Sequence, residues 1–302
     1  MATKSEYTRG DLLQYQPRHT SFVGVDSDGC VFDTMEIKQK ECFHTLMVSL
    51  WHLEPVEKYL REAAEFVNLY SQTRGANRFH GLVATFDALR RRPEVVALGI
   101  DIPKLDSLRN FIASGAPLGN PAIEQTVNAT GDHELADVLV WSLAVNQRIA
   151  EVVKGIPPYR WVRESLEKMR EHSDVIVVSQ TPSEALVREW QEHAIDVYVA
   201  AIAGQELGTK SEHIEMAMRD RYAPDRVLMI GDALGDLKAA RDNNACFYPI
   251  NPGGEEASWE RFLREACDRF LAGTYRGAYE QARVDEFDSL LPAAPPWEQV
   301  FG

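Results

Sequence analysis

The stretch that most constrains the fold of this chain is a short apolar run that ends in aspartates, Phe22-Val23-Gly24-Val25-Asp26-Ser27-Asp28-Gly29. An apolar run of this length, bounded by turn residues, predicts a buried β-strand. Side chains two positions apart share a face of a strand, so Asp26 and Asp28 are expected to face one cavity at its carboxyl end. Gly29 then allows the chain to turn sharply away.

The two aspartates suggest a metal-assisted chemistry. Neighbouring carboxylates repel each other unless a cation lies between them. Mg²⁺ takes oxygen ligands, and its usual protein site combines one or two carboxylates with a phosphate group of the substrate. A carboxylate beside a bound phosphate can also attack it and form an aspartyl-phosphate. The alternative is an acidic turn without chemistry, and the rest of the chain decides between the two interpretations.

The composition restricts the partners of such a site. The chain has 302 residues, of which 45% are apolar, enough for one large domain or two smaller ones. A net charge of −14 disfavours nucleic acid as a partner. No apolar run reaches membrane-spanning length, and the polar N-terminus lacks the apolar segment of a signal peptide. The four cysteines form no Cys-x-x-Cys pair, which gives zinc and redox motifs no support and favours a reducing, cytoplasmic location.

Between residues 34 and 154, apolar residues recur at the spacing of a helix. One such series is Phe43, Leu46, Met47 and Leu50. Strong strand signals are absent from this region. The sequence therefore predicts a helical insertion, residues 34–154, large enough to be a domain of its own. The remaining core domain is expected to be discontinuous, comprising residues 1–33 and 155–302.

Strands and helices alternate after residue 155. Apolar runs predict strands at 174–178, 197–202, 226–230 and 245–250, with helices between them. This alternation predicts an α/β fold with a Rossmann-like, three-layer core, in which a parallel sheet is covered by helices on both faces. The C-terminal stretch Leu291-Pro292-Ala293-Ala294-Pro295-Pro296 is rich in proline and is expected to be extended or mobile.

Polar residues follow four of the predicted strands, where an open parallel sheet binds its ligands. After the first strand come Asp26 and Asp28. The loops after the other three contain Ser179-Gln180-Thr181, Gly208-Thr209-Lys210 and Gly231-Asp232-Ala233-Leu234-Gly235-Asp236. Carboxylates, a hydroxyl and an ammonium are what phosphoryl transfer needs: a nucleophile, donors for the phosphoryl oxygens and ligands for Mg²⁺. We expect Thr181 to cap the helix that follows it, with contact to a phosphate as the alternative.

These four loops, in this order, resemble the motifs of the haloacid dehalogenase superfamily of phosphatases. The segment Asp26-Ser27-Asp28-Gly29 with Asp33 resembles the first motif, and Ser179 resembles the second. Lys210 resembles the third motif, and Gly231-Asp232 with Asp236 resembles the fourth. The resemblance covers residues 22 to about 250. Each motif alone is common in proteins, whereas all four in order are specific.

The resemblance implies a catalytic role for four residues. Asp26 would be the nucleophile. Asp28 would be the general acid for the leaving alcohol and then the general base for the attacking water. Ser179 would donate a hydrogen bond to a phosphoryl oxygen, and Lys210 would bridge Asp26 and the phosphoryl group.

Mg²⁺ is the cofactor that the resemblance implies. Asp26 would bind it directly through its carboxylate, and Asp28 would bind it through its backbone carbonyl. Asp232 would be a further acidic ligand, and Asp236 would bind the ion directly or through water.

The helical insertion resembles the cap of the type called C1 in this superfamily, which closes over the active site and supplies specificity residues. Substrate contacts are expected from Ser179, Gln180 and Lys210 in the core, and from Arg74 and Arg78 in the insertion. The alternative for the two arginines is a solvated helix terminus.

The sequence thus predicts a Mg²⁺-dependent phosphatase that hydrolyses a small-molecule phosphomonoester through an aspartyl-phosphate. One alternative is a phosphomutase, in which a second hydroxyl of a sugar phosphate replaces water. Another is a binding module that keeps the fold without the activity. The expected partner is a small phosphorylated metabolite, with neither nucleic acid nor membrane involved. The chain is expected to act as a monomer or homodimer.

Overall fold

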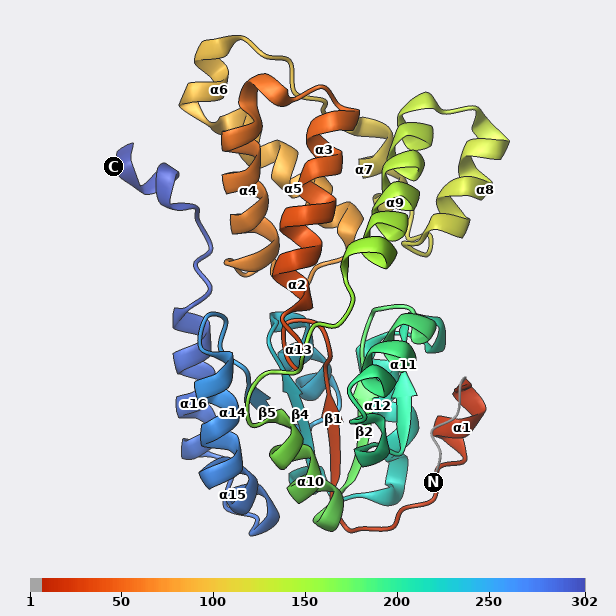
Figure 1. Ribbon diagram of the computed structural model, residues 1–302, viewed down its shortest axis with the longest axis vertical. Coiled ribbons are helices and arrows are strands. Elements are labelled where there is room, and N and C mark those ends of the chain that lie inside the picture. Colours follow the sequence, from red (N-terminus) through yellow and green to blue (C-terminus); the bar gives the residue numbers. More distant parts are fainter. Residues whose placement is uncertain (1–6, 302) are drawn as a thin grey trace. The chain divides into compact units, whose positions relative to one another are not determined.

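The computed structural model describes residues 7–301 of the chain. The chain forms two compact units (Figure 1), one comprising Met1–Met35 with Gly155–Leu291 and the other comprising Glu36–Lys154 with Pro292–Gly302. We call the first the core unit and the second the helical unit. The fold class is therefore α/β with an inserted helical domain, as the sequence predicts.

Five parallel strands form the sheet of the core unit: β1 (Phe22–Val25), β2 (Asp174–Val178), β3 (Ala201–Ala203), β4 (Val227–Gly231) and β5 (Cys246–Pro249). The order across the sheet is β3-β2-β1-β4-β5, so β1 lies at its centre. Every residue of these strands is buried, as expected of a parallel sheet that is covered on both faces. Val25 is level with Val177 and Ile230, so the loops after β1, β2 and β4 begin side by side.

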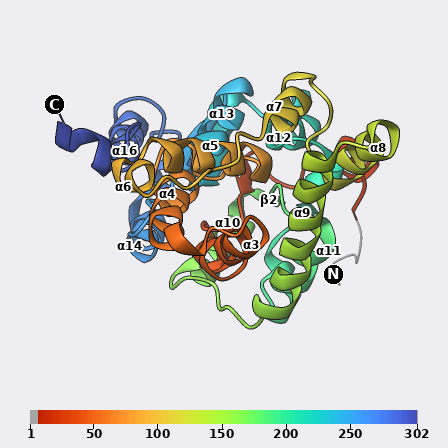
Figure 2. The same ribbon diagram turned by 90° about the horizontal axis from the view of Figure 1, so that it is seen from above.

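The strand order explains how helices cover both faces of the sheet. The chain proceeds from β1 through β2 to β3 and then returns to β4 on the other side of β1. Right-handed crossovers then place the core-unit helices that connect β1 to β2 and β2 to β3 on one face. The helices that connect β3 to β4 and β4 to β5 lie on the opposite face. Figure 2 shows this arrangement, with α10 (Val162–His172) and α11 (Ser183–Glu192) on one side and α12 (Lys210–Met218) and α13 (Leu234–Asp242) on the other. The core unit also contains α1 (Arg9–Leu13), α14 (Glu255–Arg261), α15 (Cys267–Leu271) and α16 (Ala278–Ser289).

The predicted strand at 197–202 is wrong in its first half. Asp196–Tyr198 forms a turn of 3-10 helix, and Val197 is 44% exposed. The backbone reaches β2 only at Ala200, whose N–H donates to the carbonyl of Val175 at 2.7 Å. Apolar side chains mark the whole segment as strand-like, but only the part that pairs with a neighbouring strand becomes one.

The helical unit has a hydrophobic cluster of its own, separate from that around the sheet. Aromatic rings of Phe43, Trp51, Phe86 and Trp141 pair within it, with centroids 5.7, 5.2 and 6.0 Å apart in three pairs. Its helices are α2 (Thr34–Ile37), which begins in the core unit, α3 (His44–Leu50), α4 (Glu57–Leu69), α5 (Arg78–Arg91), α6 (Pro93–Leu98), α7 (Asp106–Ala113), α8 (Asn120–Thr130) and α9 (His133–Val152). None of the helices within residues 7–301 has both the length and the hydrophobicity that a membrane crossing requires.

The C-terminal segment packs against the helical unit. A 3-10 helix, Pro296–Phe301, begins at the last residue of the proline-rich stretch, so the expectation of an extended chain is wrong at Pro296. The ring of Trp297 lies 5.7 Å from that of Phe66, and the Arg92 guanidinium lies 4.4 Å from a Trp297 ring. Aromatic and cation–π contacts therefore hold this segment on the helical unit, to which the chain belongs from Pro292 onward.

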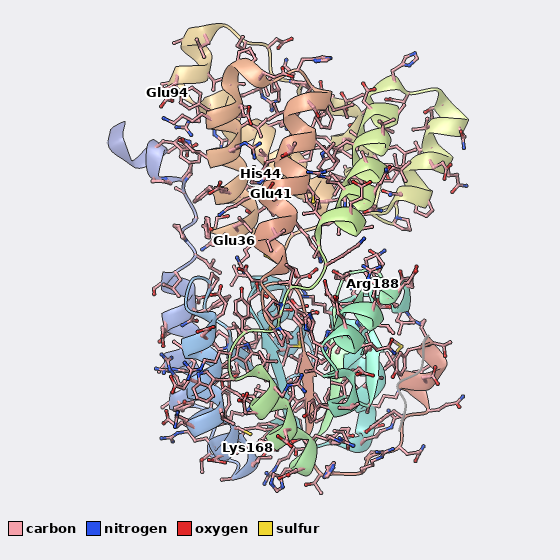
Figure 3. All side chains as sticks on the ribbon, viewed as in Figure 1. Glu36, Glu41, His44, Glu94, Lys168 and Arg188 are labelled. Atoms are coloured by element: carbon pink, nitrogen blue, oxygen red, sulfur yellow. The ribbon has the colours of Figure 1, made fainter. Side chains whose placement is uncertain are left out.

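Two buried histidines make the stability of the fold sensitive to acid. His44 on α3 (Figure 3) and His213 on α12 are both 0% exposed. Burial, with repulsion from Arg61 and Lys40, lowers the pKa of His44 to about 3, and burial lowers the pKa of His213 to about 4. In the unfolded chain both would titrate near pH 6.5. The stability that the neutral forms contribute is therefore complete above about pH 6.5 and is lost progressively as the pH falls from there to the folded pKa values.

We expect each histidine to reduce the free energy of unfolding by up to about 1.4 kcal/mol per pH unit below about pH 6.5. Urea unfolding at about pH 7.5 and about pH 5 tests this for His44→Gln, which should lose less stability on acidification than the wild type. His133→Gln, at an exposed position on α9, is the matched control and should behave like the wild type. Identical pH dependence in His44→Gln and the wild type would contradict the account. Asp26, whose raised pKa makes stability change with pH in the opposite direction, is present in both the wild type and the variant. Its contribution therefore cancels when the two proteins are compared.

Candidate active site

The loop after β1 is a tight turn that begins at Asp26. The N–H of Asp26 still donates to the carbonyl of Ile230 on β4, at 2.9 Å, so the residue is anchored to the sheet. Gly29 has a φ of 77°, which glycine adopts without strain. The N–H of Val31 donates to the carbonyl of Ser27 at 2.8 Å and closes the turn. The strand and turn predicted from the sequence are thus confirmed, and they fix the backbone on either side of the two aspartates.

Two tryptophans hold this turn in place. Trp190 of α11 donates from Nε1 to the hydroxyl of Ser27 at 3.0 Å, and Trp259 of α14 donates from Nε1 to the carbonyl of Cys30 at 2.8 Å. Both tryptophans are fully buried. A buried indole N–H usually has a hydrogen-bond partner, and here each partner belongs to residues 26–33, which we call the aspartate loop. Sequence reasoning missed both residues, because nothing in the sequence relates these helices to that loop.

A partly buried ammonium lies between two buried carboxylates at the end of the sheet. Lys210 Nζ is 2.7 Å from Asp26 Oδ2 and 2.6 Å from Asp236 Oδ1. Asp26 is 4% exposed, and Asp232 and Asp236 are 0% exposed. Carboxylate oxygens of these three aspartates lie within 4.8 Å of one another. The structure therefore brings together residues from three of the loops on which the sequence places catalytic and metal-binding groups.

The electrostatics of this cluster follow from its burial. Burial raises the pKa of Asp26 to about 6, although attraction to Lys210 opposes the shift. Burial also raises the pKa of Asp236. Burial alone would lower the pKa of Lys210, but attraction to Asp236 and Asp26 outweighs it and raises that pKa. When all four groups are ionised, the three aspartates and Lys210 carry a net charge of −2, which a divalent cation would balance. Hard carboxylate oxygens at this spacing fit Mg²⁺.

A capping box fixes the start of the helix that carries Lys210. The hydroxyl of Thr209 accepts from the N–H of Glu212 at 3.2 Å, and the carboxylate of Glu212 accepts from the N–H of Thr209 at 2.7 Å. This reciprocal pair satisfies two backbone donors at the N-terminus of α12. Lys210 is therefore the first residue of the helix, at the end nearest the loops.

Asp236 is held by the backbone of its own helix. Its Oδ2 accepts from the N–H of Ala233 at 3.1 Å, while its Oδ1 faces Lys210. A Cβ at Gly231 would lie only 2.3 to 2.4 Å from atoms of the Asp236 side chain. Glycine at the end of β4 is therefore required for Asp236 to fold back onto the strand, which is the physical reason for the Gly-Asp pair with an aspartate four residues later.

The carboxylate of Asp28 is held by two threonine hydroxyls. Thr181 Oγ1 donates to Oδ2 at 2.6 Å, and Thr34 Oγ1 donates to Oδ1. The expectation that Thr181 caps the following helix is wrong, because the N-cap of α11 is Pro182 and the carboxylate of Glu206 accepts from the first N–H of the helix, that of Ser183, at 3.0 Å. Asp28 is not one of the three clustered carboxylates, and a metal contact through its backbone carbonyl stays a prediction.

The second loop is tied to its neighbours on both sides. Ser179 is 2% exposed, and its N–H donates to the carbonyl of Ala203 on β3 at 2.9 Å. Gln180 donates from Nε2 to the carbonyl of Gly208 at 2.9 Å, which links the second loop to the third. Substrate contacts of Ser179 and Gln180 stay predictions, whereas their structural contacts show how the two loops are held together.

Arg74 and Arg78 lie in the helical unit, where Arg74 binds the end of α4 and Arg78 joins α5 to α9. Arg74 is 4% exposed and donates from Nη1 to the carbonyl of Leu69 at 2.7 Å. Arg78 donates from Nη1 to the Ser142 carbonyl at 3.1 Å and to Asn146 Oδ1 at 2.7 Å. Burial lowers the pKa of Arg78 to about 10. The interpretation as solvated residues at a helix terminus does not fit these contacts, and a substrate contact stays a prediction.

Comparison with known proteins finds similarity at the level of structure. No family model matches the chain, and no curated protein matches its sequence. Solved structures that resemble it include a haloacid dehalogenase-like family hydrolase from Streptococcus pneumoniae, with 14% identity over 81% of this chain and 91% of that chain and a TM-score of 0.42. A protein from Haemophilus somnus described as a predicted phosphoglycolate phosphatase has 11% identity over 76% and 84%, with a TM-score of 0.44. One from Bacteroides vulgatus, provisionally described as a β-phosphoglucomutase, has 13% identity over 86% and 93%, with a TM-score of 0.46.

Proposed function

We propose that this protein is a Mg²⁺-dependent phosphatase of the haloacid dehalogenase superfamily, which hydrolyses a small phosphomonoester through an aspartyl-phosphate on Asp26. The observation that carries the proposal is the position of Lys210, whose Nζ lies 2.7 Å from Asp26 and 2.6 Å from Asp236. The same two carboxylates and that of Asp232 lie within 4.8 Å of one another. A nucleophile, a fixed cation and ligands for a divalent ion are the parts that phosphoryl transfer requires.

In the first half-reaction, the carboxylate of Asp26 attacks the phosphorus atom of the bound phosphomonoester. The bond between phosphorus and the ester oxygen breaks, and Asp28 gives its proton to that oxygen. Lys210 and Ser179 donate to the phosphoryl oxygens, where negative charge develops. Mg²⁺, held by Asp26, Asp232, Asp236 and the backbone carbonyl of Asp28, would supply positive charge that offsets repulsion between the carboxylate and the phosphate.

In the second half-reaction, water attacks the phosphorus atom of the aspartyl-phosphate. Asp28 accepts a proton from that water, and the bond between phosphorus and the Asp26 oxygen breaks. Inorganic phosphate leaves, Asp26 is ionised again and Asp28 has regained its proton. If a second hydroxyl of a sugar phosphate replaced water, the same residues would catalyse a phosphomutase reaction.

The helical unit is proposed to act as a cap that selects the substrate. The support is its own hydrophobic cluster, which allows it to move as a body, and its insertion directly after the aspartate loop. Arg74, Arg78 and Gln180 are the candidates for substrate contacts beyond the transferred phosphoryl group. We propose a small phosphorylated metabolite as the substrate and the cytoplasm as the location.

Phosphate release from a panel of phosphomonoesters tests the proposed function. The panel comprises sugar phosphates, nucleotides, phosphoglycolate and 4-nitrophenyl phosphate, each incubated with Mg²⁺ and with EDTA. We expect release from at least one member, reduced at least about tenfold by EDTA and restored by excess Mg²⁺. Isomerised sugar phosphate without free phosphate would favour the mutase. Metal binding without turnover of any member would favour the inactive binding module.

A further inference from the structure

Asp28 is the one proposed catalytic carboxylate outside the cluster around Lys210, and both of its oxygens accept hydrogen bonds from threonine hydroxyls. Thr181 Oγ1 lies 2.6 Å from Oδ2, and Thr34 Oγ1 donates to Oδ1. The two donors come from different parts of the core unit, since Thr34 is the first residue of α2 and Thr181 lies in the loop after β2. Hydroxyl donors therefore reach the carboxylate from two separate segments.

The backbone of Thr181 is itself fixed from both sides. Its N–H donates to Ser179 Oγ at 3.2 Å, and its carbonyl accepts from the N–H of Gln205 at 3.1 Å. The side chain has no capping role for α11, whose N-cap is Pro182. The hydroxyl of Thr181 thus sits on the loop between β2 and α11, whose backbone is held by these two bonds, and its hydrogen bond to Asp28 links this loop to the one after β1.

We propose that Thr181 is a positioning residue for the proton-transferring carboxyl group of Asp28, an inference that rests on the proposed phosphatase function. A general acid that later acts as a base must present its oxygen to the ester oxygen and then to the water from nearly the same place. The terminal torsion of an aspartate is broad and does not fix the carboxyl plane by itself. A hydrogen bond from a hydroxyl to each oxygen fixes that plane.

Two variants of Thr181 separate positioning from packing. Thr181→Val keeps the branched shape of the side chain and removes the hydroxyl, whereas Thr181→Ser keeps the hydroxyl and removes a methyl group. If the hydroxyl acts by orienting the carboxyl group of Asp28, its loss should slow only the steps in which Asp28 donates or accepts a proton. A leaving group that departs without protonation provides the internal comparison, because 4-nitrophenolate needs no general acid whereas an alkoxide does.

The experiment measures single-turnover phosphorylation of the enzyme by an alkyl phosphomonoester from the panel and by 4-nitrophenyl phosphate, with Mg²⁺ present. For Thr181→Val we expect phosphorylation by the alkyl ester to slow about 10- to 100-fold, with KM within about twofold of the wild-type value. Phosphorylation by 4-nitrophenyl phosphate should stay within about threefold of wild type, and Thr181→Ser should resemble wild type with both substrates.

Three other outcomes overturn the proposal, and each has a different meaning. Equal slowing with both substrates would show that Thr181 supports the fold of the loop rather than the proton transfer. No slowing in Thr181→Val, with an active wild type, would show that the hydroxyl is dispensable while the phosphatase function stands. A wild type that takes a phosphoryl group from no member of the panel would overturn the proposed function and this inference together. Thermal unfolding of both variants guards against a loss of folding.

Discussion

Asp26→Asn is expected to abolish phosphate release, lowering kcat by at least about 10³-fold, while the protein stays folded. The carboxylate of Asp26 is the only oxygen nucleophile in the proposed first step, and an amide oxygen cannot form the aspartyl-phosphate. Lys210 keeps its second partner, since its Nζ also lies 2.6 Å from Asp236. The buried cluster therefore loses its nucleophile but not its central ion pair. Phosphate release and circular dichroism of the purified variant measure the two parts of this prediction.

Asp225→Asn is the matched control for this substitution. Asp225 is exposed, lies in a 3-10 turn before β4 and takes no part in the cluster of three carboxylates. The same chemical change there should leave kcat within about twofold of the wild type, because exposed substitutions of this kind have small effects. Substantial Mg²⁺-dependent activity in Asp26→Asn would contradict the mechanism.

Lys210→Met should destabilise the core unit by about 3 to 5 kcal/mol in EDTA, because it leaves buried carboxylates beside one another without the ammonium. Methionine keeps the length and apolar stem of the side chain, so the packing cost is small. The loss of stability should be smaller with excess Mg²⁺, since a cation bound by the aspartates replaces part of the missing charge. Phosphate release should also fall, because a donor to the phosphoryl oxygens is gone. Urea unfolding with EDTA and with Mg²⁺ measures the change.

Lys238→Met is the corresponding control. The Lys238 side chain is 75% exposed and pairs with Asp242 on the surface of α13. Exposed ion pairs contribute little, so this variant should differ from wild type by no more than about 0.5 kcal/mol. Lys210→Met with wild-type stability in EDTA would show that the buried carboxylates do not need the ammonium, and the electrostatic account of the site would be wrong.

The central strands and the cluster around Lys210 could be predicted from the sequence because both depend on local patterns. An apolar run that ends in a polar residue marks the carboxyl end of a buried strand, and in a parallel sheet those ends meet at one edge. Asp26, Lys210 and Asp236 follow this rule, so listing the residues after each strand was enough to bring them together. The order of the strands was not needed for that step.

Contacts that depend on the lateral arrangement of segments could not be predicted in this way. The hydrogen bond from Thr181 to Asp28 exists because β2 lies beside β1, and the sequence offered a local role for Thr181 as a helix cap instead. Trp190 and Trp259 reach the aspartate loop from helices far along the chain. The packing of Trp297 on Arg92, directly after the proline-rich stretch, could not be predicted because composition does not show which segments meet.

The most direct test of the account is to trap the phosphorylated enzyme. Wild type mixed with a substrate from the panel and Mg²⁺ is quenched with acid within the first turnover, digested with trypsin and analysed by mass spectrometry. Cleavage after Arg18 and Lys38 yields one peptide that contains both Asp26 and Asp28, and fragment ions distinguish them. We predict one phosphoryl group on Asp26, sensitive to hydroxylamine and absent from Asp26→Asn. Product formation without a modified peptide, or with the phosphoryl group on another residue, would contradict the assignment of Asp26 as the nucleophile.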